Sequence, residues 1–351
     1  MRVLGIETSC DETAAAVVDE TGLVHADVVS SQVARHAPHG GIVPELAARM
    51  HLTAIVPVVE RALEQAGGWA RIDALAVTQG PGLVGALLVG LGAARAMALA
   101  RDLPLVGVNH LEGHLLAPRL RWTESDPPGP AFPYVALLVS GGHSALYEVR
   151  DAHDVEILGQ TRDDAAGEVF DKVARLLGLG YPGGPRIDAL ASRGRADAIR
   201  WPRPMADRGD SLDMSFSGLK TAVALHVRRN GVPDDEQGLA DLCASFQRVM
   251  VDALVERAID ACLRRGASRL VLTGGVAANR GLRAAAAQAS AAHGIELFVP
   301  PVRACTDNAA MIALAATHRL ARGERADQSL APYARDPVAH VRGKMPKLRR
   351  N

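Results

Sequence analysis

The sequence is poor in aromatic residues and in cysteine, and it carries no net charge. Aromatic residues make up 3% of the 351 residues, and small aliphatic residues supply the apolar content, as is typical of α/β proteins. The cysteines form no C-x-x-C pair, which argues against a zinc ribbon or a disulfide framework. They are Cys10, Cys243, Cys262 and Cys305. Because the formal net charge is zero, a nucleic-acid partner must be met by a local patch.

The sequence also lacks an uninterrupted apolar run long enough to cross a membrane. The longest run, near Leu83 to Leu99, is broken by glycines and by Arg95, so we expect a buried helix there. The first strand is expected from Arg2 to Glu7, with no apolar stretch of signal length before it. We therefore expect a cytoplasmic protein without a membrane contact. No G-x-x-x-x-G-K-[ST] sequence is present, which excludes a P-loop.

The hydrophobic pattern repeats in the two halves of the chain. Each half opens with a short apolar strand, a turn of small residues and an antiparallel return, at 2–30 and again at 132–149, and then alternates helices with strands. A proline-rich stretch at 125–130 is the best candidate for a linker. The length fits two domains of ordinary size. We therefore predict an internally duplicated α/β protein that binds its ligand in a cleft between two lobes.

Two histidines and a distant acid indicate a working site. His110 and His114 are four residues apart and would share one face of a helix, and Asp307 lies in a Cys-Thr-Asp-Asn sequence far downstream. Two histidines and one carboxylate are the facial set of non-haem Fe(II), which leaves coordination positions open, and zinc also fits. The alternative is two polar histidines and an unrelated helix-capping aspartate.

Three turns indicate a nucleotide-type ligand. They lie at 8–13, 140–144 and 273–279, each at the end of a buried strand, and their small residues leave backbone N–H groups able to bind an anion. Asp171 and Asp188 could accept hydrogen bonds from ribose or amine groups of such a ligand. The alternative for these two carboxylates is an ion pair with Lys172 or Arg175 on a helix face.

Several longer motifs resemble those of one family, the TsaD family of tRNA adenosine threonylcarbamoyltransferases, once described as glycoproteases. The similarity extends from residue 1 to about residue 335, and motifs of this length and number are highly specific. They lie at 5–13 (GIETSCDET), 39–46 (HGGIVPEL), 80–83 (GPGL), 109–114 (NHLEGH), 139–143 (VSGGH), 216–220 (FSGLK) and 306–308 (TDN). Ser144 stands where a threonine is common in the family.

The resemblance implies a two-lobed α/β fold akin to actin, Hsp70 and sugar kinases, the ASKHA or RNase H-like group. It implies an acyltransferase that moves a threonylcarbamoyl group from L-threonylcarbamoyladenylate to N6 of the adenosine 3′ of the anticodon in tRNAs reading ANN codons, with release of AMP. His110, His114 and Asp307 would hold one divalent metal. The donor would be held by Leu138, Val139, Ser140, Gly141, Gly142, Asp171, Gly184, Asp188 and Asn279.

The expected lobes are 1–130, completed by a returning helix near 308–325, and 131–307. A basic tail is expected at 337–351, and it is one candidate for tRNA contact. A cluster of arginines is the other, at Arg186, Arg193, Arg195 and Arg200. The family resemblance implies a homologous TsaB-like partner, a TsaE-like ATPase and a TsaC-type synthase that supplies the donor.

The acceptor of the amine proton is open between Asp11, Glu12 and His143. Other functions compete with the transferase. A metalloprotease would need H-E-x-x-H, but Leu111 follows His110 and Glu112 comes one residue later, about 100° further round a helix. A small-molecule kinase or ATPase of the same fold would use Asp11 but would give the histidines no role, since kinases bind magnesium mainly through phosphates. An inactive scaffold has no reason to keep the histidines and Asp307 together.

Overall fold

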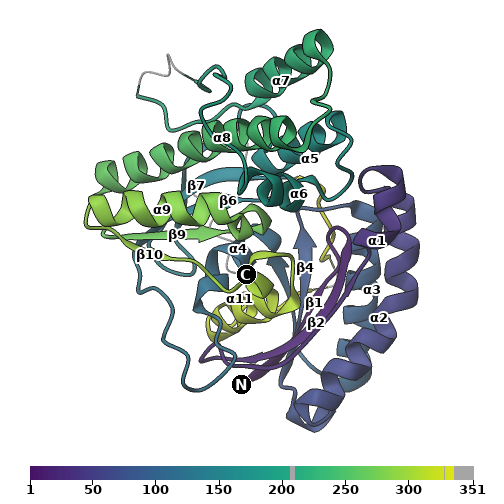
Figure 1. Cartoon of the computed structure of the whole chain (residues 1–351). Helices are drawn as coiled ribbons and strands as arrows, with labels where there is room; N and C mark the ends of the chain where they lie inside the picture. Colours follow the sequence, from purple (N-terminus) through teal and green to yellow (C-terminus); the bar gives the residue numbers. More distant parts are fainter. Residues whose placement is uncertain (206–209, 328, 336–351) are drawn as a thin grey trace. The chain divides into compact units, whose positions relative to one another are not determined.

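The computed structural model describes residues 1–205, 210–327 and 329–335 and divides the chain into two compact units (Figure 1). The first unit is Met1–Pro130 together with Pro300–Asn351, and the second is Ala131–Val299. The basic tail expected at 337–351 lies outside the described residues.

The first unit is built on a mixed five-stranded sheet in the order β3-β2-β1-β4-β5. The strands are β1 (Arg2–Glu7), β2 (Glu12–Asp19), β3 (Val24–Ser31), β4 (Ala74–Gly80) and β5 (Leu105–Asn109). β2 pairs antiparallel with β1 and β3, whereas β4 runs parallel to both β1 and β5. The meander followed by parallel strands confirms the expected opening of the chain.

Helices cover both faces of this sheet. α2 (Pro44–Ala66) and α3 (Val84–Arg101) lie side by side on one face, where Leu4 and Ile6 join their hydrophobic core (Figure 1). Gly5 lies between Leu4 and Ile6 in β1 and faces the opposite side of the sheet, because successive residues of a strand point to opposite faces. There α11 (Ala309–Ala321) packs so closely that a Cβ on Gly5 would lie 2.5 Å from the carbonyl oxygen of Ala309. The short helices are α1 (Val33–His36), α4 (His110–Leu116) and α10 (Val302–Cys305).

The second unit repeats the same strand order, β10-β9-β6-β7-β8. Its strands are β6 (Tyr134–Val139), β7 (Ser144–Val149), β8 (Val155–Gln160), β9 (Arg269–Thr273) and β10 (Glu296–Phe298). Its helices are α5 (Ala166–Leu176), α6 (Gly183–Ala191), α7 (Ser217–Asn230), α8 (Glu236–Arg265) and α9 (Arg280–Ala292). Again the first strand pairs antiparallel with the second and parallel with the fourth, so the duplication expected from the sequence is present.

The boundary expected at residue 307 is wrong by a few residues, because Pro300 to Asp307 belong to the first unit. Local contacts explain this. The Arg303 guanidinium stacks 4.1 Å from the ring centroid of Trp122, and α10 packs against residues 117–119. The residues beyond 299 therefore join the first unit before α11 begins.

By its length and composition alone, α3 could cross a membrane. Within the part of the chain that the structure describes it is the one helix of that kind. It packs against α2 and β4, and its Ala86, Leu87 and Leu91 are buried. A third of the helix is buried, so the burial expected from the sequence is present on one face of α3, while the other face is exposed.

Candidate metal and substrate site

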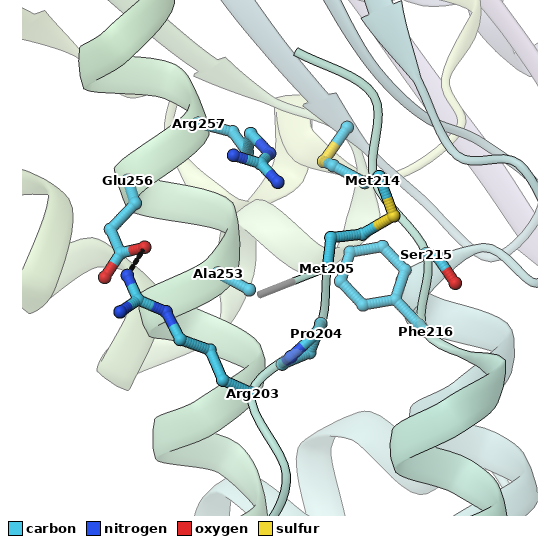
Figure 2. A pocket seen from close by; sticks show the side chains of 9 residues that line it. All are labelled: Arg203, Pro204, Met205, Met214, Ser215, Phe216, Ala253, Glu256 and Arg257. Carbon is cyan, nitrogen blue, oxygen red and sulfur yellow. Dashed lines mark hydrogen bonds and ion pairs between the residues drawn. The ribbon is translucent and has the colours of Figure 1, made fainter. Parts of the chain in front are cut away.

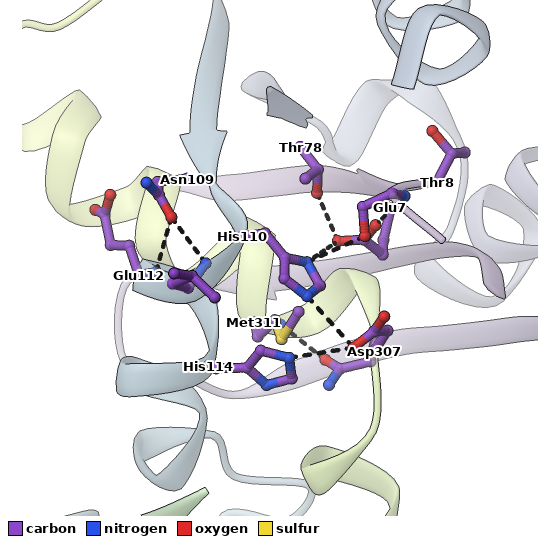
Figure 3. A network of polar contacts seen from close by, with 12 residues as sticks. Glu7, Thr8, Thr78, Asn109, His110, Glu112, His114, Asp307 and Met311 are labelled. Carbon is purple, nitrogen blue, oxygen red and sulfur yellow. Dashed lines mark hydrogen bonds and ion pairs between the residues drawn. The ribbon is translucent and has the colours of Figure 1, made fainter. Parts of the chain in front are cut away.

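The turn from β5 into α4 positions the two histidines. Asn109, the last residue of β5, caps α4 by accepting hydrogen bonds from the backbone N–H groups of Leu111 (2.8 Å) and Glu112 (3.4 Å), as asparagine commonly does at this position. The cap starts the helix at His110, so His110 and His114 stand one turn apart on one face. Their ring centroids are 4.7 Å apart with the rings perpendicular (Figure 3).

Asp307 reaches the histidines from the start of α11. The next residue, Asn308, caps α11 by accepting from the N–H of Met311 (2.9 Å). The Oδ1 atom of Asp307 lies 3.1 Å from Nε2 of His114 and 3.4 Å from Nε2 of His110 (Figure 3). The structure thus brings together the three residues that the sequence proposed as a metal set, with one ligand atom of each within 4.8 Å of the others.

The donor atoms suit a divalent transition metal. Atoms that share one ion at about 2.1 Å lie roughly 3.0–3.4 Å apart, the spacing seen here between Asp307 and each histidine. Both histidines are buried, whereas the carboxylate of Asp307 is partly exposed, which leaves one side of the cluster open. Imidazole nitrogen together with carboxylate oxygen is the donor mixture that iron and zinc accept.

Glu7, which the sequence analysis did not single out as a site residue, holds the far side of His110. It is fully buried at the end of β1, and its Oε2 lies 3.0 Å from Nδ1 of His110. Thr78 donates to the same oxygen at 2.6 Å, and the N–H of Ser9 donates to Oε1 (Figure 3). The signal available in the sequence was an acidic residue inside a strand whose other residues are mostly apolar. A carboxylate behind a ligating histidine fixes the tautomer that leaves Nε2 free for a metal.

The charges of the cluster follow from these contacts. Burial opposes a charge on His110, but Asp307 and Glu7 outweigh burial and raise the pKa of His110 to about 10. Burial lowers the pKa of His114 despite its hydrogen bond to Asp307. Burial likewise opposes ionisation of Asp307, yet His110 holds the pKa of Asp307 well below its usual value. A proton on His110 therefore neutralises part of a site that contains two carboxylates, and a metal ion would take its place.

The first turn contains two of the candidate proton acceptors, Asp11 and Glu12. Burial, reinforced by Asp11, raises the pKa of Glu12 to about 8. One oxygen of Glu12 accepts from Ser31 Oγ at 2.9 Å, while the other is buried without a hydrogen-bond partner. Glu12 is therefore mostly a neutral acid at pH 7, which is the wrong state for taking up a proton.

In the second unit, the turn after β6 exposes backbone rather than side chains. Leu138 and Val139 are fully buried, so their side chains belong to the core. Ser140 closes the turn: its N–H donates to the carbonyl of His143 (2.7 Å), and its Oγ accepts from the N–H of His143 (3.1 Å). Gly141 and Gly142 are exposed, and no atom lies within 4 Å of the Cβ positions they lack. A ligand could approach the backbone of this turn closely.

The remaining donor-site candidates form a hydrogen-bonded framework in the same unit. Asp171 on α5 accepts from the N–H of Gly183 at 2.7 Å, next to Gly184 at the start of α6. The alternative ion pair of Asp171 with Lys172 is not formed, because the amino group of Lys172 bonds to Asp164 and Glu168. Burial raises the pKa of Asp171.

Asp188 and Asn279 are linked through two residues that the sequence analysis missed. Asp188 accepts from Arg280 Nε (2.7 Å) and from Gln247 Nε2 (3.1 Å). Asn279 caps α9 by accepting from the N–H of Leu282 (2.8 Å) and donates to Oε1 of Gln247 (2.8 Å). Nothing in the spacing of Gln247 and Arg280 marked them, since they come from different helices.

Half of the arginine cluster proposed for tRNA contact is already neutralised. Arg193 pairs with Glu236 and Arg195 with Asp241, each at 2.6 Å. A different basic surface lies between α5 and α7, where a groove of about 450 Å³ has four cations and no acid among its lining residues. The cations are Lys172, Arg175, Lys220 and Arg228.

The duplicated sheet flanked by helices defines the class of fold, that of actin-like proteins. Two solved structures share it. Component A of the (R)-2-hydroxyglutaryl-CoA dehydratase of Acidaminococcus fermentans has a TM-score of 0.52 at 16% identity, over 92% of this chain and 99% of that one. Full-length HypF has a TM-score of 0.59 at 14% identity, over 91% of this chain and 55% of that one. At these identities the likeness concerns the fold alone.

Sequence comparison defines the family. The profile of "TsaD: tRNA N6-adenosine threonylcarbamoyltransferase" matches residues 24–314. Relatives with the name tRNA N6-adenosine threonylcarbamoyltransferase include one from Anaeromyxobacter dehalogenans (strain 2CP-C), 59% identical over 94% of this chain and 97% of the relative. Another, from Sorangium cellulosum (strain So ce56), is 57% identical over 97% of this chain and 98% of the relative. The chain belongs to the TsaD family, as the motifs indicated.

Proposed function

We propose that this chain transfers the threonylcarbamoyl group of L-threonylcarbamoyladenylate to N6 of the adenosine 3′ of the anticodon in tRNAs reading ANN codons. The observation that carries this function is the family match over residues 24–314, with relatives of that name at 57–59% identity over almost the whole chain. The chain is thus an acyltransferase of tRNA modification, and tRNA is its substrate. Its expected place of action is the cytoplasm, where tRNA is found.

We assign one divalent metal to His110, His114 and Asp307, with Fe(II) favoured and Zn(II) the alternative. The spacing of the three donor atoms, the open side at Asp307 and the carboxylate of Glu7 behind His110 support this assignment. The reaction is not a redox reaction, so a bound metal would supply Lewis acidity, polarising a carbonyl or neutralising a phosphate. The protein's own contribution is to keep Nε2 of each histidine directed at one point.

The donor is assigned to the second unit. In the turn after β6 the N–H of Ser140 is engaged with His143, and the exposed Gly141 and Gly142 offer their backbone N–H groups to an oxygen that gains negative charge, an interaction whose loss typically costs about 3–4 kcal/mol of transition-state stabilisation. Asp171, with its raised pKa, suits a contact with ribose or amine groups. Gly184 comes directly after Gly183, whose N–H donates to Asp171. Asp188 and Asn279 are the other residues that we assign to donor binding.

The chemistry requires a base as well as an electrophile. N6 of the adenosine attacks the carbamoyl carbon, the bond from that carbon to the phosphate oxygen breaks, AMP leaves, and the amine gives up one proton. Asp11 and His143 remain the candidates to take this proton, since Glu12 is mostly neutral at pH 7. All of these steps are transfers of a proton or an acyl group, with no change of oxidation state.

The groove between α5 and α7 is the surface that we assign to the tRNA backbone. Lys172 and Lys220 are partly neutralised by Asp164, but Arg228 has no ion pair among the described residues. Arg228→Glu is expected to raise the KM for tRNA about tenfold and to reduce the salt dependence of binding by about one phosphate contact. Arg229→Glu, the same change on the next residue of α7 and outside the groove, is the matched control. Equal effects of both variants would contradict this placement.

A TsaB-like partner is assigned to the outer face of α2 and α3. Leu52 and Val56 on α2 and Leu88 on α3 are each more than half exposed, an unusual density of exposed apolar side chains on adjacent helices. A partner of the same fold would present a similar pair of helices, so apolar faces of like shape would meet. A TsaE-like ATPase and a TsaC-type synthase, the source of the donor, complete the expected set.

The test of the proposed function is reconstitution. The chain is combined with TsaB-like and TsaE-like partners, a TsaC-type synthase, threonine, bicarbonate, ATP and a tRNA transcript, and the modified nucleoside is measured by mass spectrometry. His110→Ala and Asp307→Ala are expected to abolish the product while the protein stays folded. His25→Ala, a histidine of the same unit paired with Asp19, serves as the control. Full activity of a metal-depleted His110→Ala protein would contradict the assignment of the metal.

A further inference from the structure

The second unit contains a small cavity beside α8 that the proposed reaction does not use. Its volume is about 200 Å³, and its lining comes from α8 and from two segments, 203–205 and 214–216 (Figure 2). Met205, Met214 and Phe216 line one side and Ala253 of α8 the other, and polar side chains, among them Arg203, Glu256 and Arg257, complete the lining. Arg257, also on α8, is the charged lining residue that is almost fully buried.

Arg257 is buried, and one of its guanidinium N–H groups has no partner among the described residues. Only 4% of its surface is exposed. Its Nε donates to the carbonyl of Asp213 at 3.1 Å, but its Nη1 is buried and has no hydrogen-bond partner. Figure 2 shows the guanidinium directed from α8 toward the space beside Met214. Among the described residues Arg257 makes no ion pair.

The neighbouring carboxylate is already engaged. Glu256 also lines the cavity, yet its side chain is paired with Arg203 (Figure 2). The other arginines of α8 are paired: Arg264, about two turns further along the helix, with Asp260 at 2.8 Å, and Arg248 with Asp252. Even Arg319, mostly buried in the first unit, pairs with Glu112. Arg257 departs from this pattern.

Such an arrangement would be stabilised by an anion from outside the chain. Arginine stays protonated at every accessible pH, and an uncompensated buried charge is strongly destabilising. A water molecule would satisfy the hydrogen bond of Nη1 but not the charge. Because Arg257 is almost fully buried, a charge pair that it forms is stronger than the same pair in water.

We propose that this cavity binds a small oxyanion, a phosphate group, with Arg257 as its charged ligand. A water molecule occupies about 30 Å³, so 200 Å³ holds a phosphate and some water, whereas pockets for whole organic ligands begin near roughly 300 Å³. The guanidinium of arginine matches phosphate geometry through parallel N–H donors. Free inorganic phosphate and the terminal phosphate of a nucleotide are the two sources of such a group, and this one site would accept the phosphate group of either.

Thermal unfolding of the full chain in chloride and in inorganic phosphate, at matched ionic strength, tests the proposal. The melting temperature of the wild type is expected to rise with phosphate and to saturate. Arg257→Met, similar in volume but neutral, is expected to lose this response and to be at least as stable as the wild type in phosphate-free buffer, because it removes an uncompensated charge. Arg264→Met, which breaks an existing ion pair on the same helix, is expected to keep the phosphate response.

Two results would overturn the proposal. One is a phosphate response of Arg257→Met equal to that of the wild type. The other is a lower stability of Arg257→Met in phosphate-free buffer, which would mean that another group of the chain already neutralises Arg257. Arg257→Lys serves as a second variant in case Arg257→Met does not fold, because it keeps the charge. The phosphate concentration that gives half of the stabilisation is expected to rise about tenfold in Arg257→Lys, because the paired N–H donors are lost.

AMP distinguishes the two sources of the phosphate group. If the site accepts only free phosphate, AMP at the same concentration is expected to stabilise the wild type and Arg257→Met equally, through other contacts. If a terminal phosphate of a nucleotide enters, the stabilisation by AMP is expected to fall in Arg257→Met. Neither outcome depends on threonylcarbamoyl transfer, so the cavity and the proposed reaction are tested separately.

Discussion

The variant Glu7→Gln would measure how much the buried carboxylate behind His110 contributes to metal binding. In the structure, Glu7 Oε2 receives hydrogen bonds from Thr78 Oγ1 (2.6 Å) and from His110 Nδ1 (3.0 Å), while Oε1 receives one from Ser9. Glutamine has nearly the same shape but only one acceptor oxygen. If its NH₂ group faces His110, the imidazole either keeps only Ser9 Oγ, at 3.3 Å, as the acceptor of Nδ1–H or moves its proton to Nε2, the atom that faces Asp307.

The expected cost can be stated from this geometry. Loss of the partner behind a ligating histidine typically lowers metal affinity about 10- to 100-fold, which corresponds to about 1.4–2.7 kcal/mol. We expect Glu7→Gln to weaken Fe(II) and Zn(II) binding by this factor, measured by competition with a chromophoric chelator, under anaerobic conditions for iron. Transfer activity is expected to recover when the metal concentration is raised by the same factor.

Glu112→Gln is the matched control for this measurement. It makes the same chemical change on α4, between the two histidines in sequence, but Glu112 pairs with the mostly buried Arg319. Its expected effect is a lower melting temperature with metal affinity unchanged. Metal affinity of Glu7→Gln within twofold of the wild type would refute the role assigned to Glu7.

Three further changes test other parts of the molecule. Gly5→Ala is expected to lower the free energy of unfolding by about 3 kcal/mol in denaturant titrations, because the new Cβ would lie 2.5 Å from the carbonyl of Ala309, and an unchanged midpoint would contradict this packing. Glu12→Gln should match the wild type near pH 4.5 and become the more stable protein as the pH rises to 8, because a folded pKa of about 8, above the ordinary value of 4.5, gives low-pH stability that is lost over this window. The shift corresponds to about 5 kcal/mol at most, which partial exposure of the carboxyl reduces to roughly 2 kcal/mol at pH 9. A pH-independent difference in melting temperature would contradict this prediction. Leu88→Asp should abolish binding of a TsaB-like partner in size-exclusion chromatography, whereas Leu263→Asp, an equally exposed leucine of the second unit, should not, and equal effects would argue against the α2–α3 face.

Local patterns in the sequence predicted the elements that bring the site together. The four-residue spacing of His110 and His114 requires only a helix, and the asparagine before them provides its cap. The repeated strand, turn and return predicted the duplication, because each depends on neighbouring residues. Asp307 was predicted as a metal ligand from its family motif and from its carboxylate, and in the structure its Oδ1 lies 3.1 Å from Nε2 of His114.

Other parts could not be predicted, because they depend on contacts between distant segments. Glu7 is a site residue only because β1 ends beside α4, 103 positions further along the chain. Gln247 connects Asp188 with Asn279 from a helix that carries no recognisable motif. The ion pairs of Arg193 with Glu236 and of Arg195 with Asp241 were equally hidden, and together they neutralise half of the predicted basic cluster. Burial, which sets the protonation of Glu12, is also a property of the fold.

The first unit is interrupted in the sequence, since residues 131–299 are inserted between its two parts. Both histidines are therefore synthesised long before Asp307, the third member of the cluster. A nascent chain has two imidazoles and Glu7 at this place but no closing carboxylate until α11 follows. If the three residues hold the metal that we assign to them, its tight uptake would be a late step of biogenesis, after the inserted unit has been synthesised.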